Sequence, residues 1–503
     1  MNGRLIVAVL SLSLMLACRG TPAPALPSPP HLSPATPNST DTIKQRVASI
    51  LSDPAVSAGT WGVEVRSLIT NQTLVEANPH RLLMPASTMK TLTLAVAADQ
   101  LGWDYTYETS GLTNGAVKDG VLDGDLVVVG SGDPSFDDWD GAASAVFASW
   151  ADKLKALGIT TIGGRIVGND DVFADQGLGA GWMWDDLAFA YSASASGLQF
   201  NEGTAQVLIT PGAAVGEPAV LALAPSHARV PIVNDMRTGA PGSGTAIALH
   251  ALPRSPGARL AGAIALDSGR QVRNVSVDNP TLYFANALRT GLMANGVEVL
   301  GGAADGDDLV DRPNANGAGA GLTHRSPTLL VLADTLMKLS QNLYAETFLL
   351  TLGRAGGQAG TAQAGIGVVQ RVLASWGVPE SEVLMADGSG LSRYNLVTAD
   401  AIVSVLAHVY GDPRLREPYI AALPVAGRAG TLSARLLGTA AEGNAQAKTG
   451  AFKNARAMAG FVRTADGEPL VFSIMANNYG VPPADVDRVT DAIVVALAEF
   501  RRN

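Results

Sequence analysis

A change of pattern along the chain limits its possible folds more than any other feature. From about residue 105 to 320, short runs of β-branched residues alternate with Gly and Asp turns, as in 124–130 and 160–168, which predicts mostly β-strands. The flanking segments instead carry apolar residues at helical spacing, as in 43–51 and 484–500. The sequence therefore predicts an α+β domain that is interrupted by a large, mostly β insertion.

The insertion itself divides into two parts. Between about residues 200 and 275 large apolar residues become sparse, and Pro-Gly turns appear. This stretch predicts a smaller module nested within the larger one, and the Asp-, Asn- and Gly-rich stretch 301–321 predicts a loop that returns to the first domain. The expected boundaries are 41–104 and 322–503 for the α+β domain, 105–200 and 276–321 for the inserted domain, and 201–275 for the nested domain.

The first eighteen residues have the character of an export signal. Arg4 supplies a positive charge, and the apolar run from Leu5 to Ala17 is too short to span a bilayer as a folded helix. Cys18, the only cysteine, follows directly in a context that resembles a bacterial lipobox, so we expect a lipid anchor there. Two residues of that context depart from the usual pattern, which leaves ordinary signal cleavage open. The proline-rich residues 19–40 predict an extended spacer between a membrane and a domain in the cell envelope or periplasm.

Ser87 and Lys90 stand at the start of an apolar run with helical character. Residues three apart share one face of a helix, so the lysine amine is expected beside the serine hydroxyl. A serine becomes a nucleophile when a neighbouring base removes its proton, and burial or a second cation can leave a lysine neutral enough to act as that base. This short motif is common by chance, so taken alone it more often marks an ordinary capped helix with a surface lysine.

Two further motifs follow in a fixed order. Ser340 and Asn342 form a Ser-x-Asn motif, and Lys448 begins a Lys-Thr-Gly motif that leads into a predicted strand. The ordered trio is the signature of penicillin-binding proteins and class A β-lactamases. Because a long stretch separates Ser87 from Ser340, and because the stretches 129–136 and 387–393 are typical of it, the chain most resembles the D-alanyl-D-alanine carboxypeptidase/endopeptidase family S13. The resemblance extends from about residue 45 to 480.

This resemblance implies a penicillin-binding, transpeptidase-like catalytic domain, and it implies roles for the motif residues. Ser87 would attack the peptide bond of a terminal D-Ala-D-Ala and form an acyl-enzyme, with Lys90 as the base and Lys448 as a second candidate for that role. Ser340 would relay a proton to the leaving amine, and Asn342 would hold the acyl-side amide.

The third motif would bind the other end of the substrate. Lys448 and Thr449 would bind its terminal carboxylate, and Gly450 would let an edge strand approach closely. Backbone amides of Ser87 and of a residue near Ala451 would form the oxyanion hole.

The insertion carries a segment, 181–191, that resembles the part of S13 enzymes that reaches back to the catalytic cleft. By that resemblance Asp186, Tyr191 and Arg393 would line a pocket for the substrate's side chain. The chemistry suits meso-diaminopimelate: Asp186 would take its ammonium group, Arg393 its carboxylate, and Tyr191 would pack on the methylenes.

Other classes of function find little support in the sequence. A formal net charge of −10 disfavours a nucleic-acid partner. The six histidines lack metal-ligand spacing, so we expect no metal and no cofactor. The expected partners are peptidoglycan stem peptides and β-lactam antibiotics. The alternatives are a serine β-lactamase, which needs a deacylating device that we cannot locate, and a non-catalytic cell-wall-binding lipoprotein. The sequence leaves the balance of carboxypeptidase and endopeptidase activity open.

Overall fold

The computed structural model describes residues 40–54, 56–174, 178–253, 255–313, 318–354 and 358–502. The predicted signal segment, Cys18 and all but the last residue of the predicted spacer lie outside these ranges. Among the residues it describes, the longest apolar helices still fall short of what a membrane crossing requires.

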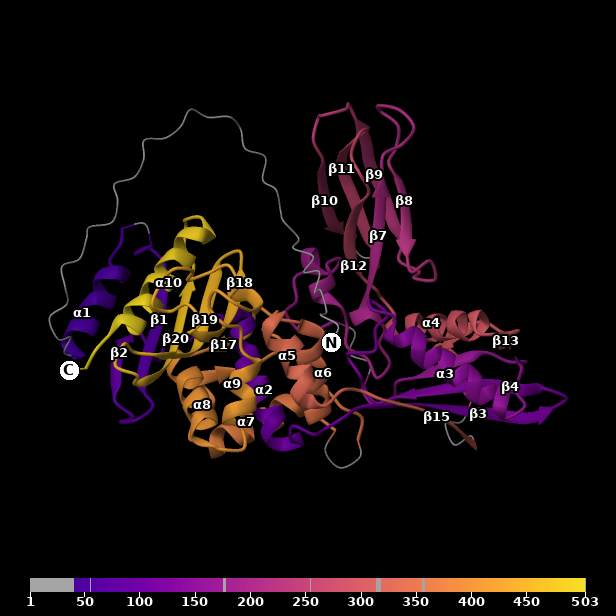
Figure 1. Ribbon diagram of the computed structural model, residues 1–503, viewed down its shortest axis with the longest axis horizontal. Coiled ribbons are helices and arrows are strands. Elements are labelled where there is room, and N and C mark those ends of the chain that lie inside the picture. The colour runs from indigo at the N-terminus through magenta and orange to yellow at the C-terminus, as the bar shows by residue number, and fades with distance from the viewer. Residues whose placement is uncertain are drawn as a thin grey trace. The chain divides into compact units, whose positions relative to one another are not determined.

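A five-stranded antiparallel sheet, in the order β18-β19-β20-β1-β2, forms the centre of the first domain (Figure 1). Its strands are β1 (Thr60–Ser67), β2 (Thr73–Ala77), β18 (Gln446–Phe452), β19 (Ala455–Arg463) and β20 (Pro469–Asn477). Side chains alternate between its two faces, as in β20, where Phe472 and Ile474 belong to one apolar cluster and Val471 and Met475 to the other. Helices α1 (Thr40–Leu51) and α10 (Pro483–Glu499) contribute to the first cluster.

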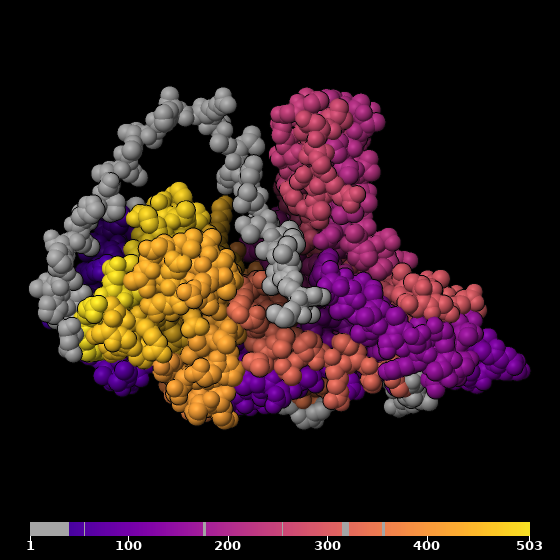
Figure 2. All heavy atoms as spheres, viewed as in Figure 1, coloured from indigo at the N-terminus to yellow at the C-terminus, as the bar shows by residue number. Residues whose placement is uncertain are grey.

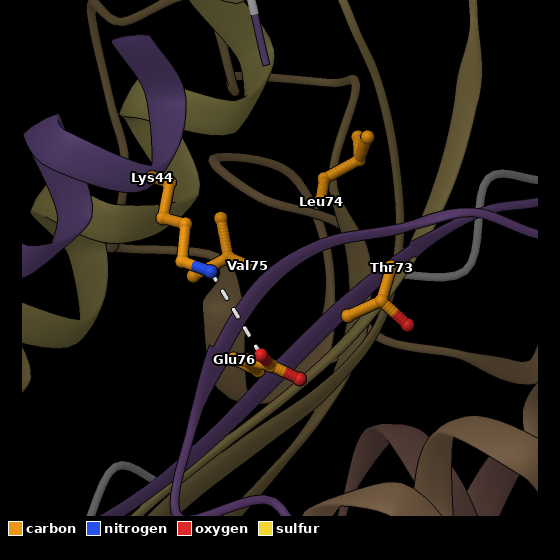
Figure 3. A pocket seen from close by; sticks show the side chains of 5 residues that line it. All are labelled: Lys44, Thr73, Leu74, Val75 and Glu76. Carbon is orange, nitrogen blue, oxygen red and sulfur yellow. Dashed lines mark ion pairs between the residues drawn. The ribbon is translucent and has the colours of Figure 1, made fainter. Parts of the chain in front are cut away.

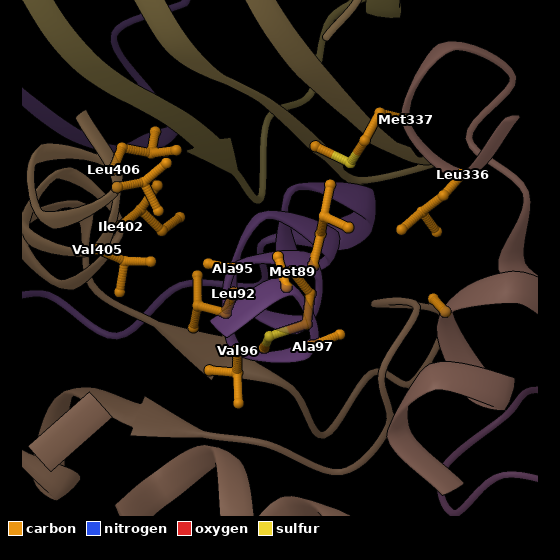
Figure 4. Packing of buried hydrophobic residues seen from close by; sticks show 14 of the residues in the cluster. Met89, Leu92, Ala95, Val96, Ala97, Leu336, Met337, Ile402, Val405 and Leu406 are labelled. Carbon is orange, nitrogen blue, oxygen red and sulfur yellow. The ribbon is translucent and has the colours of Figure 1, made fainter. Parts of the chain in front are cut away.

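The second face is covered by helices, with α2 (Lys90–Leu101) at their centre. The helices around it are α5 (Leu329–Lys338), α6 (Asn342–Leu352), α7 (Ala362–Ser375), α8 (Ala399–Gly411) and α9 (Arg416–Ala422). Leu92 and Val96 of α2 are fully buried, and Figure 4 shows them in the same cluster as Met337 of α5 and Leu406 of α8. Because α2 is apolar on nearly all sides, it is a buried helix, and its first turn is held firmly in place.

The insertion begins with a seven-stranded mixed sheet. The path β13-β5-β4-β3-β15 contains β3 (Glu108–Lys118), β4 (Val121–Gly130), β5 (Thr161–Ile162), β13 (Glu298–Val299) and β15 (Ala318–Arg325). Off this path, β6 (Ile166–Asn169) pairs with β4, and β14 (Ala303–Asp305) pairs with β6. Two helices, α3 (Ala142–Ala156) and α4 (Pro280–Ala294), share its apolar core. The expectation of a mostly β insertion was incomplete, because α3 packs the aromatic residues Phe147 and Trp150 against this sheet.

The nested part consists of two three-stranded sheets. One has the order β12-β7-β8, with β7 (Thr204–Thr210), β8 (Val220–Ala224) and β12 (Gln271–Ser276). The other has the order β10-β11-β9, with β9 (Ile232–Gly239), β10 (Ala246–Ala251) and β11 (Ala258–Ala265). Buried residues such as Val207 and Leu260 belong to a common apolar cluster, and Figure 2 shows the atoms of these strands packed closely together.

One local expectation needs correction. The stretch 301–321 was predicted as a loop, but it contains β14 and the start of β15, which continues past residue 321 to Arg325. The predicted α+β class, with helices packed on an antiparallel sheet, is confirmed. We keep the division into three domains as a proposal.

Candidate active site

Ser87 lies in a short 3-10 turn, η1 (Ala86–Met89), directly before α2. Ala86 has a φ of 47°, in the left-handed region that a residue with a side chain rarely adopts. The apolar burial of α2 holds this turn, so Ser87 is half-buried while Lys90, the first residue of the helix, is fully buried. The Lys90 Nζ atom lies 3.1 Å from the Ser87 Oγ atom.

The amine of Lys90 has two further partners from distant parts of the chain. Its Nζ donates to Asn342 Oδ1 at 2.6 Å and to the backbone oxygen of Ser389 at 2.7 Å. Burial lowers the pKa of Lys90 to about 7, and the carboxylates of Asp387 and Glu346 oppose that shift. A neutral amine keeps two hydrogens, which suffice for Asn342 and Ser389, and leaves its lone pair for the Ser87 hydroxyl. The site can therefore hold Lys90 as a base.

Ser340 and Lys448 form a second pair. Lys448 Nζ donates to Ser340 Oγ at 2.8 Å and to the backbone oxygen of Thr449 at 2.8 Å. Burial, reinforced by the positive charge of Lys90, holds the pKa of Lys448 well below its ordinary value. Ser340 has a φ of 60°, so its backbone is also in the left-handed region. The second pair is thus arranged to pass a proton between a lysine and a serine.

The insertion also contacts this centre. Asn342 Nδ2 donates to the backbone oxygen of Tyr191 at 2.8 Å, so the same amide joins Lys90 to the inserted segment. Both polar ends of the Asn342 side chain are used, which fixes its orientation.

The strand β18 lies at the edge of the central sheet and passes close to the serine. A Cβ atom on Gly450 would lie 2.5 Å from the Pro85 oxygen and 3.0 Å from the Ser87 nitrogen. Only glycine allows this approach, which brings the backbone of β18 to the serine turn. The hydroxyl of Thr449 lies 2.7 Å from that of Thr431, a residue for which the sequence analysis had given no role.

Asp186, Tyr191 and Arg393 also lie together. The Tyr191 hydroxyl donates to Asp186 Oδ1 at 2.7 Å, and Arg393 Nη2 lies 3.8 Å from Asp186 Oδ2. The Arg393 guanidinium stacks 3.4 Å above the ring centroid of Phe452 in β18, and its Nη1 atom is buried with no hydrogen-bond partner among the described residues. Burial lowers the pKa of Arg393, against the opposing effect of Asp186.

Sequence reasoning missed the groups that support Lys90 from behind. Glu346 Oε1 accepts from the Ser389 nitrogen at 2.8 Å, and burial together with Asp387 raises the pKa of Glu346 to about 8. Asp387 accepts from Trp182 Nε1 at 2.9 Å and from the Ser392 nitrogen at 2.6 Å. Asp387 lies in the stretch 387–393 and Glu346 follows the Ser-x-Asn motif, but only the tertiary contacts give them a role.

A surface hollow elsewhere is lined by Lys44, Thr73, Leu74, Val75 and Glu76 (Figure 3). Its main polar contact is a 3.8 Å ion pair between Lys44 and Glu76, both more than half exposed. An exposed ion pair of this kind contributes little to stability, and we assign no function to the hollow.

The site and the fold together define a class of protein. A serine beside a buried lysine, a Ser-x-Asn turn and a Lys-Thr-Gly edge strand on a helix-covered antiparallel sheet are the parts of a penicillin-recognising serine enzyme. Residues 43–500 match the D-Ala-D-Ala carboxypeptidase 3 (S13) family. The chain therefore belongs to that family, as the motifs had led us to expect.

Individual relatives agree with this assignment. The chain is 33% identical over 492 residues to a D-alanyl-D-alanine carboxypeptidase of Actinomadura sp. (strain R39), an alignment that covers 95% of this chain and 88% of the relative. It is 27% identical over 452 residues to the D-alanyl-D-alanine carboxypeptidase DacB of Haemophilus influenzae, an alignment that covers 88% of this chain and 89% of the relative. The crystal structure of penicillin binding protein 4 from that organism has the same fold, with a TM-score of 0.78 and 24% identity over 90% of this chain and 99% of the other.

Proposed function

We infer that this protein is a serine-type D-Ala-D-Ala carboxypeptidase that acts on peptidoglycan stem peptides through an acyl-enzyme on Ser87. The observation that carries the inference is the 3.1 Å approach of the Ser87 hydroxyl to the amine of a fully buried lysine, in a chain that belongs to the S13 family. Relatives of the chain are named as carboxypeptidases for D-alanyl-D-alanine.

In the acylation step, Ser87 Oγ attacks the carbonyl carbon of the penultimate D-Ala while its proton moves to Lys90 Nζ. Lys90 can accept this proton because burial brings its pKa to about 7. The backbone nitrogen of Ser87 and a backbone nitrogen near Ala451 stabilise the oxyanion, a geometry favoured by the close passage of Gly450 beside Ser87.

Collapse of the tetrahedral intermediate breaks the C–N bond and releases D-Ala. The leaving amine takes a proton from the Ser340 hydroxyl, and the proton that Lys90 took from Ser87 replaces it by way of Lys448, whose Nζ lies 2.8 Å from Ser340 Oγ. Water then attacks the acyl-enzyme and gives its proton to Lys90 or Lys448, and that proton passes to Ser87 Oγ as the acyl bond breaks, which restores the serine. We keep both lysines as candidates for the general base, with Lys90 preferred because of its direct contact with Ser87.

We propose that the terminal carboxylate of the substrate binds at the hydroxyl of Thr449, next to that of Thr431. A protonated Lys448 keeps one hydrogen for that carboxylate, because its other two are engaged by Ser340 and by the backbone oxygen of Thr449. An endopeptidase reaction uses the same acyl-enzyme and differs only in the leaving amine. β-Lactams would acylate Ser87 through the same carbonyl chemistry.

Labelling with a fluorescent penicillin tests the function. We expect a stable covalent band, in agreement with a slowly deacylating carboxypeptidase, and release of D-Ala from a pentapeptide. Rapid turnover of the penicillin without accumulated label would favour a β-lactamase. Absence of both labelling and D-Ala release would favour a non-catalytic wall-binding protein and overturn the proposal.

We also propose that Asp186, Tyr191 and Arg393 bind the side chain of meso-diaminopimelate. The support is the contact of Asp186 with both partners and the unpaired Nη1 of Arg393, a free donor for a carboxylate. Loss of a charge-assisted hydrogen bond from a dry pocket costs about 1.5–3 kcal/mol. Wild type should therefore prefer diaminopimelate pentapeptides over lysine or side-chain-blocked ones, and Asp186→Ala and Arg393→Ala should reduce that preference. A wild type without preference, or two variants that keep it, would contradict this pocket while leaving Ser87 unaffected.

Export with a lipid anchor at Cys18 remains a proposal that rests on the sequence alone. Cys18→Ala should release the protein from the membrane fraction, or leave its signal uncleaved, while the purified catalytic domain stays active. Normal processing of this variant with unchanged membrane partitioning would contradict the anchor.

A further inference from the structure

The middle residue of the Ser-x-Asn motif makes a contact that the mechanism above does not use. Gln341 Nε2 donates to Glu202 Oε2 at 2.6 Å, which joins the motif to the insertion. The other end of the same amide, Oε1, accepts from the Leu343 nitrogen at 3.4 Å and so caps the N-terminus of α6. One side-chain amide is therefore held from two sides.

The two neighbours of Gln341 are the residues to which we assign chemistry. Ser340 receives a hydrogen bond from Lys448, and Asn342 receives one from Lys90. Ser340 has a left-handed backbone, a conformation that persists only where surrounding contacts impose it. The contact from Gln341 to Glu202 is well placed to impose this backbone conformation on Ser340.

Glu202 is itself held in an unusual conformation. It lies in the short turn η4 (Asn201–Gly203) with a φ of 55°, next to Asn201 with a φ of 51°. The Asn201 side chain accepts from the Asp138 nitrogen at 2.7 Å, which ties this turn to the segment before α3. Two successive left-handed residues are costly, so the turn is specified by its surroundings and presents the Glu202 carboxylate to Gln341.

We propose that Glu202 is a positioning residue for the reaction, acting through the side-chain amide of Gln341 to hold Ser340 and Asn342 in place. This rests on the proposed function, because it assigns the insertion a part in that same site. Glu202 touches no reacting atom, and its effect passes entirely through Gln341.

The acceptor oxygen of Glu202 decides how the Gln341 amide is oriented. The titratable groups that act on Glu202 or respond to it are Asp137, before α3, and Tyr344 of α6. Burial and the charge of Asp137 raise the pKa of Glu202 to about 7, and Gln341 opposes that shift. An ionised Glu202 only accepts, so the amide nitrogen faces it and the amide oxygen caps α6. A protonated Glu202 keeps one oxygen as an acceptor, so it can hold the amide in the same orientation.

Exchanging the two side chains tests this role. Gln341→Glu places two carboxylates in contact, so at pH 8 they repel each other, whereas at pH 6 a shared proton restores one hydrogen bond. We expect acylation by fluorescent penicillin to fall about tenfold relative to wild type at pH 8, and the ratio to approach one at pH 6. The double variant Glu202→Gln/Gln341→Glu restores one donor and one acceptor, so its ratio to wild type should be close to one at both pH values.

A matched control lies six residues further along the chain, in α6. Gln199 of the insertion donates from Nε2 to Thr347 Oγ1 at 3.0 Å, and Thr347→Val removes this link without touching the motif. Its acylation ratio should not depend on pH. If Gln341→Glu fails to fold at pH 8, two variants of Glu202 decide. Glu202→Gln should keep the wild-type acylation rate, whereas the acylation rate of Glu202→Ala should fall about tenfold.

The inference is overturned by a pH-independent deficit in Gln341→Glu, by a double variant that does not recover, or by equal rates in Glu202→Gln and Glu202→Ala. Failure of the proposed function is recognised separately, because wild type itself would then take no penicillin on Ser87.

Discussion

The pH dependence of acylation is the sharpest consequence of the buried lysine pair. If Lys90 is the base, only its neutral form accepts the proton of Ser87, and with a pKa of about 7 half of it is neutral at pH 7. At pH 5 the neutral fraction is about 1%, so acylation should be about fiftyfold slower than at pH 7. Above pH 8 the rate should level off. The sign follows from the base role: activity is lost as the pH falls through the folded-state pKa.

A stopped-flow measurement with a penicillin gives the acylation rate constant at each pH, since the carboxylate of the drug stays ionised throughout this range. Lys448 also has a lowered pKa, but its Nζ contacts Ser340 rather than Ser87, so we assign the step to Lys90. Lys90→Arg is the control, because a guanidinium stays protonated at every accessible pH. A flat profile from pH 5 to 8, or an arginine variant with near wild-type acylation, would refute Lys90 as the base.

Three further outcomes are expected. Ser87→Ala should fold normally and form no penicillin adduct in intact-mass spectrometry; an adduct would place the nucleophile elsewhere. Gly450→Ala places a Cβ atom 2.5 Å from the Pro85 backbone, so Ser87 has to shift and acylation should fall at least about tenfold; an unchanged rate would contradict the close approach. Lys90→Met should be inactive yet no less stable on thermal unfolding. Because the pKa of Lys90 is lower in the folded state than in the unfolded state, the buried lysine reduces the free energy of unfolding. This reduction is about 5 kcal/mol below pH 7 and fades as the pH rises towards 10.5. A clear loss of stability in the variant would contradict this.

Much of the fold could be predicted because it depends on local patterns. Helices α1 and α10 follow from the period-3.6 apolar spacing of 43–51 and 484–500, and their ends differ from those ranges by at most three residues. The helix α3 was missed because it lies among Gly- and Asp-rich segments that resemble β turns. The stretch 301–321 was predicted as a loop because its short strands β14 and β15 are specified by their partners β6 and β3 rather than by their own apolar residues.

The sequence by itself determined the family of this protein and, with it, the candidate catalytic residues. Ser87, Lys90, Ser340, Asn342 and Lys448 stand in motifs whose spacing is local, so their identity and their family could be read without coordinates.

Only the tertiary structure decided how those motifs meet. Burial of α2 lowers the pKa of Lys90, and Ser389, Glu346 and Glu202 reach the site from segments far apart in the chain. The physical reason is that a pKa and a hydrogen-bond partner depend on what surrounds a group in space, and those surroundings are set by packing between distant elements rather than by neighbours in sequence.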